Sequence, residues 1–313
     1  MITSITYPDD PRPTTWHQPV LALGNFDGMH RGHLKIVERV RRVADERNSD
    51  AVAMTFEPHP SKIVRPDKAP LLLMTHQQKL DALGRAGMHG VAVVRFTPEL
   101  AQWDPETFVR VVLVEWLHVA EVWVGANFLF GHDRSGNFSL LRSLGARYGF
   151  RAEKIDPVRY KDFVVSSTRI RRLITEGRVD EAGALLGHHY FIEGSVVHGQ
   201  HRGRDLGFPT ANLCSENELI PPSGVYATTV TLDGVTFPAM TNIGTRPTFE
   251  EAEDTVIETH VLDFDRDLYG TKLKLGFVQR LRDEKRFENV DALKQQISHD
   301  RGQAQSLFDR MGL

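Results

Sequence analysis

Residues 24–33 read GNFDGMHRGH and stand between a short apolar run, Val20–Leu23, and a stretch with helical spacing. In that stretch Leu34, Val37 and Val40 recur every three or four residues, so they share one face of a helix. Ligands of doubly wound α/β sheets bind at the carboxyl ends of strands, which is where the quoted string falls. The string therefore predicts this fold, with a ligand-binding turn after its first buried strand.

The first 186 residues alternate strand-like and helical patterns. Such alternation indicates a parallel sheet wound by right-handed crossovers. Asp104 followed by Pro105 predicts the cap and first turn of a helix that continues through Leu117. Two further helices are expected at about 167–176 and 179–186. The predicted strands besides the first are Ala51–Phe56, Val91–Phe96, Val122–Gly125 and Ala152–Ile155.

After Gly187 the pattern becomes β-rich, and Asp233-Gly234 between two alternating runs is typical of a tight hairpin. The expected strands are Phe191–His198, Val225–Leu232, Val235–Ile243, Thr255–Asp263 and Lys272–Val278. Five or six antiparallel strands of this length favour a small barrel, against which a helix from Leu293 to Met311 is expected to pack. The predicted fold class is α/β plus β, in two domains, 1–186 and 187–313.

Composition and charge limit the function. The chain has 313 residues, 41% of them hydrophobic and 25% charged, which fits two globular domains. The net charge is −3, with +3 on residues 1–187 and −6 on residues 188–313. This charge argues against a nucleic-acid partner. No apolar run is long enough to span a membrane, and Met1–Pro13 lacks a secretory pattern. Cys214 is the single cysteine, which fits a reducing, cytoplasmic setting.

The histidines of the quoted string are candidate phosphate ligands. Gly24 and Gly28 permit a tight turn, and a helix beginning near Arg31 presents free N–H groups and the positive end of its dipole. His30 and His33 are three residues apart, so both can face one anion. The alternative is two surface histidines at a helix start. A zinc pair is disfavoured because no third ligand has suitable spacing.

The string also contains the H-x-G-H motif of the nucleotidyltransferase superfamily, and its longer form resembles the bacterial bifunctional riboflavin kinase/FAD synthetase family. Three further strings are similar to segments of that family and fall in the same order at predicted strand ends or helix starts. They are TFEPHP at 55–60, VGANFLFG at 124–131 and SSTRIR at 166–171.

This resemblance implies transfer of the adenylyl group of ATP to a flavin phosphate by the first domain. It implies that His30, His33 and Arg171 are catalytic and that His59 and Asn127 lie near the flavin. Two alternatives remain open: Asp27 can anchor its own turn, and His59 can serve turn geometry between Pro58 and Pro60. The residues implied to bind ATP and its phosphates are Gly24, Asn25, Phe26, Asp27, Gly28, Ser166, Ser167 and Thr168.

A second string, GRDLGFPTAN, occupies residues 203–212. Gly203 and Gly207 suit a backbone that approaches a phosphate closely. The hydroxyl of Thr210 and the amide oxygen of Asn212 are hard ligands suited to Mg²⁺, and they would share one face of an extended segment. The alternative is a tight loop. The string matches the P-T-A-N motif of the riboflavin kinase family. NIGTRPTF at 242–249 and Glu258 resemble other segments of the same family.

Glu258 is a candidate general base. Strand alternation places Glu258 and His260 on one face, and Ile257, Thr259 and Val261 on the other. A carboxylate that faces a cavity can accept the proton of a ribityl hydroxyl, and the resemblance implies this role. The alternative is a solvated charge on an open barrel face.

The sequence thus predicts a bifunctional enzyme whose small-molecule partners are riboflavin, FMN and ATP, with Mg²⁺ as cofactor. Its second domain phosphorylates riboflavin to FMN, and its first domain converts FMN to FAD.

Three alternatives are a nucleotidyltransferase for another phosphorylated small molecule with a specificity barrel, a non-catalytic flavin-binding protein, and a class I aminoacyl-tRNA synthetase. The metal-ligand candidates of the barrel argue against the first, and intact phosphate-binding residues against the second. SSTRIR, where a synthetase has a lysine-rich motif, argues against the third.

Overall fold

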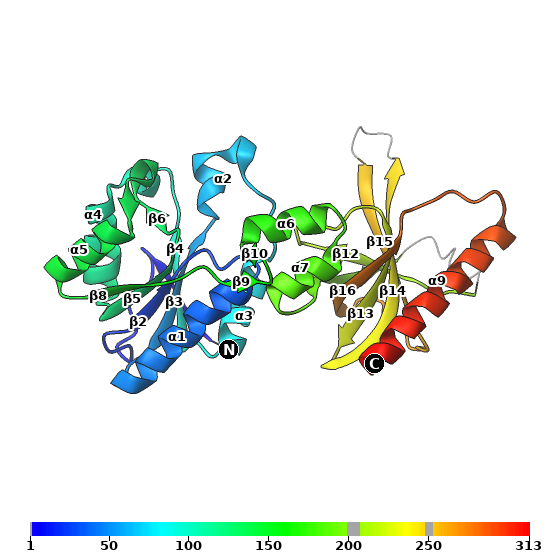
Figure 1. The fold of residues 1–313 in the computed structure, drawn as a ribbon, viewed down its shortest axis with the longest axis horizontal. Helices are drawn as coiled ribbons and strands as arrows, with labels where there is room; N and C mark the ends of the chain where they lie inside the picture. Colours follow the sequence, from blue (N-terminus) through cyan, green and yellow to red (C-terminus); the bar gives the residue numbers. More distant parts are fainter. Residues whose placement is uncertain (1, 199–206, 248–252) are drawn as a thin grey trace. The chain divides into compact units, whose positions relative to one another are not determined.

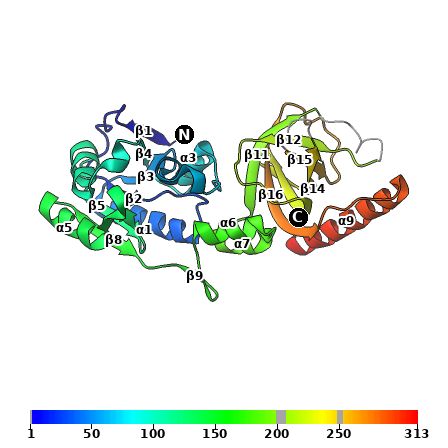
Figure 2. The same cartoon turned by 90° about the horizontal axis from the view of Figure 1, so that it is seen from above.

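The computed structural model describes residues 2–198, 207–247 and 253–313. The chain divides into two compact units, Met1–Ser167 and Thr168–Leu313 (Figures 1 and 2). The division at 186/187 stays a prediction, since the two helices expected to close the first domain lie in the second unit. In the part of the chain that is described, no helix is both long and apolar enough to cross a bilayer.

A six-stranded parallel sheet forms the first unit, in the order β1-β4-β3-β2-β5-β8 (Figure 1). The five predicted strands are confirmed, and all of them except β8 are buried along most of their length. The edge strand β1, which pairs with β4, was not predicted. The strands are β1 (Thr3–Tyr7), β2 (Val20–Leu23), β3 (Ala51–Glu57), β4 (Gly90–Arg95), β5 (Glu121–Gly125) and β8 (Arg151–Ile155).

Helices cover both faces of this sheet. Helix α1 (Arg31–Arg47) packs on β2, β3 and β5, and α3 (His76–Arg85) packs on β4. Right-handed crossovers place the π-helix η3 (Val109–Trp116) and α5 (Phe138–Tyr148) on the opposite face. The helix expected through Leu117 is therefore present, but it is α-helical only over α4 (Pro105–Phe108).

The winding of the sheet reverses beside β2. Strands β3 and β4 continue to one side of β2, whereas β5 and β8 lie on its other side. The chain segments that leave β2 and β5 therefore diverge and open a crevice at the carboxyl ends of these strands. The quoted turn begins at Gly24, directly after β2, and Asn127 follows the end of β5. The order of the strands thus brings the first and third family-like strings to the place where such sheets bind ligands.

Short elements complete the first unit. Asp104 caps α4 as predicted, because its Oδ1 accepts from the N–H of Thr107 at 3.0 Å. The short elements are α2 (Pro60–Val64), η1 (Pro66–Lys68), η2 (Leu100–Gln102), β6 (Leu129–Phe130), η4 (His132–Arg134), β7 (Gly136–Asn137), β9 (Arg159–Tyr160) and β10 (Phe163–Val164).

The second unit contains a closed six-stranded antiparallel barrel in the order β11-β12-β15-β14-β13-β16 (Figure 2). The hairpin is confirmed, since Asp233 and Gly234 have φ of 51° and 81°. The unpredicted strand β12 completes the barrel. The strands are β11 (Tyr190–Val197), β12 (Ala211–Ser215), β13 (Gly224–Leu232), β14 (Val235–Pro247), β15 (Glu253–Val261) and β16 (Lys272–Arg282).

The helices expected at 167–176, 179–186 and 293–311 are present as α6 (Ser167–Thr175), α7 (Val179–Leu186) and α9 (Val290–Met311). Of these, α9 was expected to pack on the barrel, whereas α6 and α7 were expected to close the first domain. Helix α7 buries its apolar side chains against β11 and β16. Helix α9 packs on the outer face of the barrel, where Ala304 and Phe308 meet a cluster of strand residues. Those strand residues are Ala227, Met240 and Val278.

The packing of α7 predicts where the second unit can be separated. A fragment 167–313 should fold more stably than a fragment 187–313, which lacks Leu185 and Leu186, both buried in α7. Loss of two buried leucines costs roughly 3–6 kcal/mol. Urea unfolding followed by circular dichroism should therefore give a lower midpoint for the shorter fragment. Equal midpoints would show that α7 contributes nothing to barrel stability.

Candidate active sites

The turn between β2 and α1 has a left-handed backbone at several positions. Phe26, Gly28 and Met29 have φ of 51°, 89° and 41°. Phe26 is fully buried, and its ring meets the ring of His33 edge-on at 5.3 Å between centroids. The buried ring of Phe26 therefore anchors the turn against the start of α1.

His30 and His33 lie together at the N-terminus of α1, as expected. His30 is the N-cap residue, and its Nδ1 accepts from the N–H of His33 at 3.2 Å. An Nδ1 that accepts is unprotonated, so the neutral ring carries its proton on Nε2. The two rings stack with 3.6 Å between centroids and 16° between planes. This arrangement combines imidazole N–H groups with the positive end of the helix dipole.

Asp27 anchors a distant segment of the chain. Its buried carboxylate accepts from the N–H of Leu73 at 3.0 Å and from that of Met74 at 3.1 Å. Its carbonyl oxygen accepts from the hydroxyl of Ser167 at 2.9 Å. The turn and the start of the SSTRIR string are therefore in contact. Thr168 and Arg171 follow on α6, in the second compact unit.

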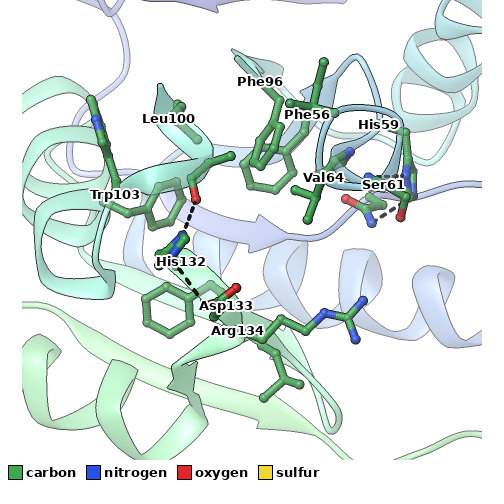
Figure 3. A pocket seen from close by; sticks show the side chains of 18 of the residues that line it. Phe56, His59, Ser61, Val64, Phe96, Leu100, Trp103, His132, Asp133 and Arg134 are labelled. Carbon is green, nitrogen blue, oxygen red and sulfur yellow. Dashed lines mark hydrogen bonds and ion pairs between the residues drawn. The ribbon is translucent and has the colours of Figure 1, made fainter. Parts of the chain in front are cut away.

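A cavity of about 650 Å³ lies at the crevice beside β2 and β5 (Figure 3). It brings together four predicted site residues, because Gly24, Asn25, His59 and Asn127 all line it. The sequence analysis missed most of its aromatic lining, which comes from separate elements. Its aromatic residues are Phe56, Phe96, Trp103, Phe108, Phe128 and Phe130. A flat, apolar ligand with a polar edge fits such a lining.

His59 joins the cavity to the turn. Its Nδ1 accepts from the N–H of Ser61 at 3.2 Å and so caps α2 (Figure 3), which is the geometric role left open by the sequence. The Nε2 then carries the proton and lies 3.1 Å from the amide of Asn25. His59 therefore serves both a turn and the wall of the cavity.

The second site lies on three adjacent barrel strands. Asn212 of β12 is directly opposite Glu258 of β15, and Glu258 is directly opposite Asn242 of β14. Residues opposite each other in antiparallel strands have Cβ atoms about 4.5–5.5 Å apart and share a face of the sheet. The register therefore brings a carboxylate and two amides into one row.

This row lies on the outer face of the barrel. The inner face carries a buried ladder in which the hydroxyl of Thr241 lies 2.8 Å from that of Thr228 and 2.9 Å from that of Thr259. Because neighbours along a strand point to opposite faces, Glu258 points outward, where it is half-buried. The alternation predicted around Glu258 is thus confirmed.

The backbone of the P-T-A-N string is fixed from β15. Nδ1 of His260 donates to the carbonyl of Pro209 at 2.8 Å, and burial lowers the pKa of His260, which favours this neutral form. Thr210 is half-buried and directly precedes β12. Gly207 has a left-handed φ of 86°, whereas Gly203 lies outside the described residues.

The metal candidates of this site are oxygen ligands. Within the described ranges, no group of three or more His, Cys, Asp or Glu side chains is placed to hold a metal ion. A hydroxyl from Thr210 and an amide oxygen from Asn212, beside the Glu258 carboxylate, form a donor set that fits Mg²⁺ with retained water ligands.

The fold and the two sites define a class: a nucleotidyltransferase-type domain joined to a kinase-type barrel. Two family models match the chain, one described as FAD synthetase over residues 12–169 and one as riboflavin kinase over residues 186–308. The chain belongs to the bifunctional riboflavin kinase/FMN adenylyltransferase family.

Relatives match over nearly the whole length. The bifunctional riboflavin kinase/FMN adenylyltransferase of Escherichia coli (strain K12) is 38% identical over 92% of each chain. The protein of the same name from Bacillus subtilis (strain 168) is 33% identical over 98% of each chain. A solved structure from Streptococcus pneumoniae, described as a macrolide-efflux protein, has a TM-score of 0.88 and 29% identity. It covers 97% of this chain and 99% of that chain.

The contacts of Asp27 give a local prediction. Asp27→Ala leaves the buried N–H groups of Leu73 and Met74 without their acceptor, which costs about 1–3 kcal/mol for each group. Hydrogen exchange at these two amides should become faster. Asp27→Asn is the matched control, because it keeps an oxygen in place and should retain most of the protection. Unchanged exchange in Asp27→Ala would contradict the anchoring role.

Proposed function

We propose that this chain phosphorylates riboflavin to FMN in its barrel and adenylylates FMN to FAD in its first unit. The observation that carries the proposal is the aromatic cavity at the strand crevice. Asn25 lines this cavity, and the β2–α1 turn that contains Asn25 ends at His30. A flavin ring and a phosphate need these two environments side by side. A cytoplasmic setting, which supplies ATP and keeps the exposed thiol of Cys214 reduced, is part of the proposal.

In adenylyl transfer, a phosphate oxygen of FMN attacks the α-phosphorus of ATP, and pyrophosphate leaves. We assign His30 and His33 to the phosphates, since imidazole N–H groups at a helix N-terminus stabilise the charge that develops there. Ser166, Ser167 and Thr168 add hydroxyls, and Arg171 is assigned to the leaving pyrophosphate. The protein acts by position and charge, with no covalent step of its own.

The flavin ring is assigned to the cavity. Phe128 and Phe130 stack with 5.3 Å between centroids and 18° between planes, so a flat surface is already present in the wall. Asn127 and His59 supply polar groups at the edge of this wall. A ring system with one apolar face and one hydrogen-bonding edge would be oriented by both kinds of contact, which leaves its phosphate directed at the turn.

In the kinase reaction, Glu258 accepts the proton of the terminal ribityl hydroxyl, whose oxygen attacks the γ-phosphorus of ATP, and ADP leaves. Thr210 and Asn212 are the residues that would hold Mg²⁺, which neutralises phosphate charge when bound. Gly203 and Gly207 are assigned to the close approach of the backbone to the phosphates.

The two activities should separate by mutation at the first site. With riboflavin, ATP and Mg²⁺, the wild-type protein should form FMN and then FAD, resolved by chromatography. His30→Ala or His33→Ala should lower FAD formation by about 10²–10³-fold, while FMN accumulates. The exposed His17 provides a matched control, since His17→Ala should leave both products unchanged. Normal FAD output from the site variants would remove this assignment, and equal loss of both products would indicate misfolding.

The reverse separation is expected at the barrel. Glu258→Gln keeps shape but loses the proton acceptor, so FMN synthesis should fall by about 10²–10⁴-fold while riboflavin still binds. Asn212→Ala should also slow the kinase and change its dependence on Mg²⁺ concentration. Adenylylation of supplied FMN should persist in both. Glu216→Gln, which changes an exposed carboxylate after β12, is the control. A normal kinase rate in Glu258→Gln would exclude the general-base role.

A further inference from the structure

Lys79 is a buried cation that neither proposed reaction uses. It lies on α3 with 3% of its surface exposed. Burial of an ammonium group is costly unless partners compensate it, and lysine at a helical position normally extends into solvent. The fold therefore keeps this charge inside the first unit for a reason that helix propensity does not supply.

The ammonium group of Lys79 lies beside two polar side chains, Thr55 and Glu57. Its Nζ donates to the hydroxyl of Thr55 at 3.3 Å and lies 3.9 Å from the carboxylate of Glu57. Burial lowers the pKa of Lys79, and the nearby carboxylates of Glu57 and Asp27 oppose that shift. His76, 3.2 Å from Glu57, is the other titratable group at this cluster. The cation therefore balances two carboxylates, one of which anchors the turn.

The hydrogen bonds from Lys79 have a fixed direction. An ammonium group can only donate, so the Thr55 oxygen accepts from Lys79 and its own proton must point elsewhere. It points to the carbonyl of Asn25, to which the Thr55 hydroxyl donates at 3.1 Å. Thr55 is fully buried, so its hydroxyl has no access to bulk solvent. The charge of Lys79 thus orients the hydroxyl that holds the first peptide of the turn.

We propose that Lys79 is a positioning residue for adenylyl transfer: acting through Thr55, it fixes the turn that places His30 at the phosphates. The proposal rests on the proposed FMN adenylyltransferase activity. Asn25 is joined to Lys79 through Thr55, and its amide meets His59 at the cavity wall. A displacement of about 1 Å at such a position can cost on the order of 10²-fold in rate.

Substitution of Lys79 and Thr55 tests this chain of contacts. Lys79→Met and Thr55→Val should each lower kcat for adenylylation of supplied FMN by about 10–10²-fold. The dissociation constant for FMN, followed by flavin fluorescence, should stay within about twofold, because Lys79 is not among the cavity-lining residues. The double variant should be little slower than the slower single variant, since both remove the same link.

Three controls accompany these variants. Thr55→Ser keeps the hydroxyl and should retain the wild-type rate. Lys35→Met removes an exposed lysine of α1 and should change nothing. Riboflavin kinase activity, measured on the same chain, should persist in every variant.

The outcomes distinguish failure of the positioning role of Lys79 from failure of the proposed FMN adenylyltransferase activity. A wild-type chain that makes no FAD from FMN and ATP would refute the proposed function itself. With an active wild type, normal kcat in Lys79→Met and Thr55→Val would overturn the positioning role. A matching loss of FMN binding would also overturn it, since that result indicates a structural role. If Lys79→Met fails to fold, the comparison of Thr55→Val with Thr55→Ser decides the question: equal rates for these two overturn the inference, and a slower valine variant supports it.

Discussion

The buried carboxylate of Asp27 is the constraint on which the first unit depends. A turn with left-handed Phe26, Gly28 and Met29 does not hold its shape by local preference, because non-glycine residues avoid that conformation. Asp27 supplies the missing restraint by accepting two backbone N–H groups from a segment before α3. Its carbonyl receives the Ser167 hydroxyl as well. One residue thus joins the β2–α1 turn, the segment that precedes α3 and Ser167.

The same constraint explains why the cavity lies where it does. A turn held inward at Asn25 leaves room between the diverging connections of β2 and β5, and the chain fills the walls of that room with aromatic rings. These rings come from segments that are far apart in sequence, and only Phe56, Phe128 and Phe130 fall within the strings singled out from the sequence. Polar side chains lie next to the turn, at Asn25 and His59, and a second polar group, His132, Asp133 and Arg134, lies across the cavity (Figure 3). A ligand that enters is therefore oriented by the architecture before any catalytic group acts.

Sequence patterns predicted the buried strands, the barrel and the position of the first turn, because burial on both faces leaves continuous apolar runs. They missed β1, an edge strand that pairs on one side only, and β12, whose five residues become a strand because the barrel closes over them. Helical spacing over eight residues does not separate an α-helix from the π-helix at Val109–Trp116. Lys79 has the spacing of a surface lysine, and only the approach of Thr55 from β3 reveals its burial.

The barrel carries its candidate residues on the outer face of its strands, whereas the sheet carries them at strand ends. Its interior is closed by apolar side chains and a ladder of threonines, whose hydroxyls satisfy one another at Thr228, Thr241 and Thr259. A buried interior of this kind has no space for a charged nucleotide, which supports the proposal that phosphate binds at the outer face. Strand alternation then decides which residues are available: Asn212 and Glu258 point outward because their neighbours point inward. The closed interior and the outward-facing row of Asn212 and Glu258 are therefore consequences of a single register, and a slip by one residue would exchange them.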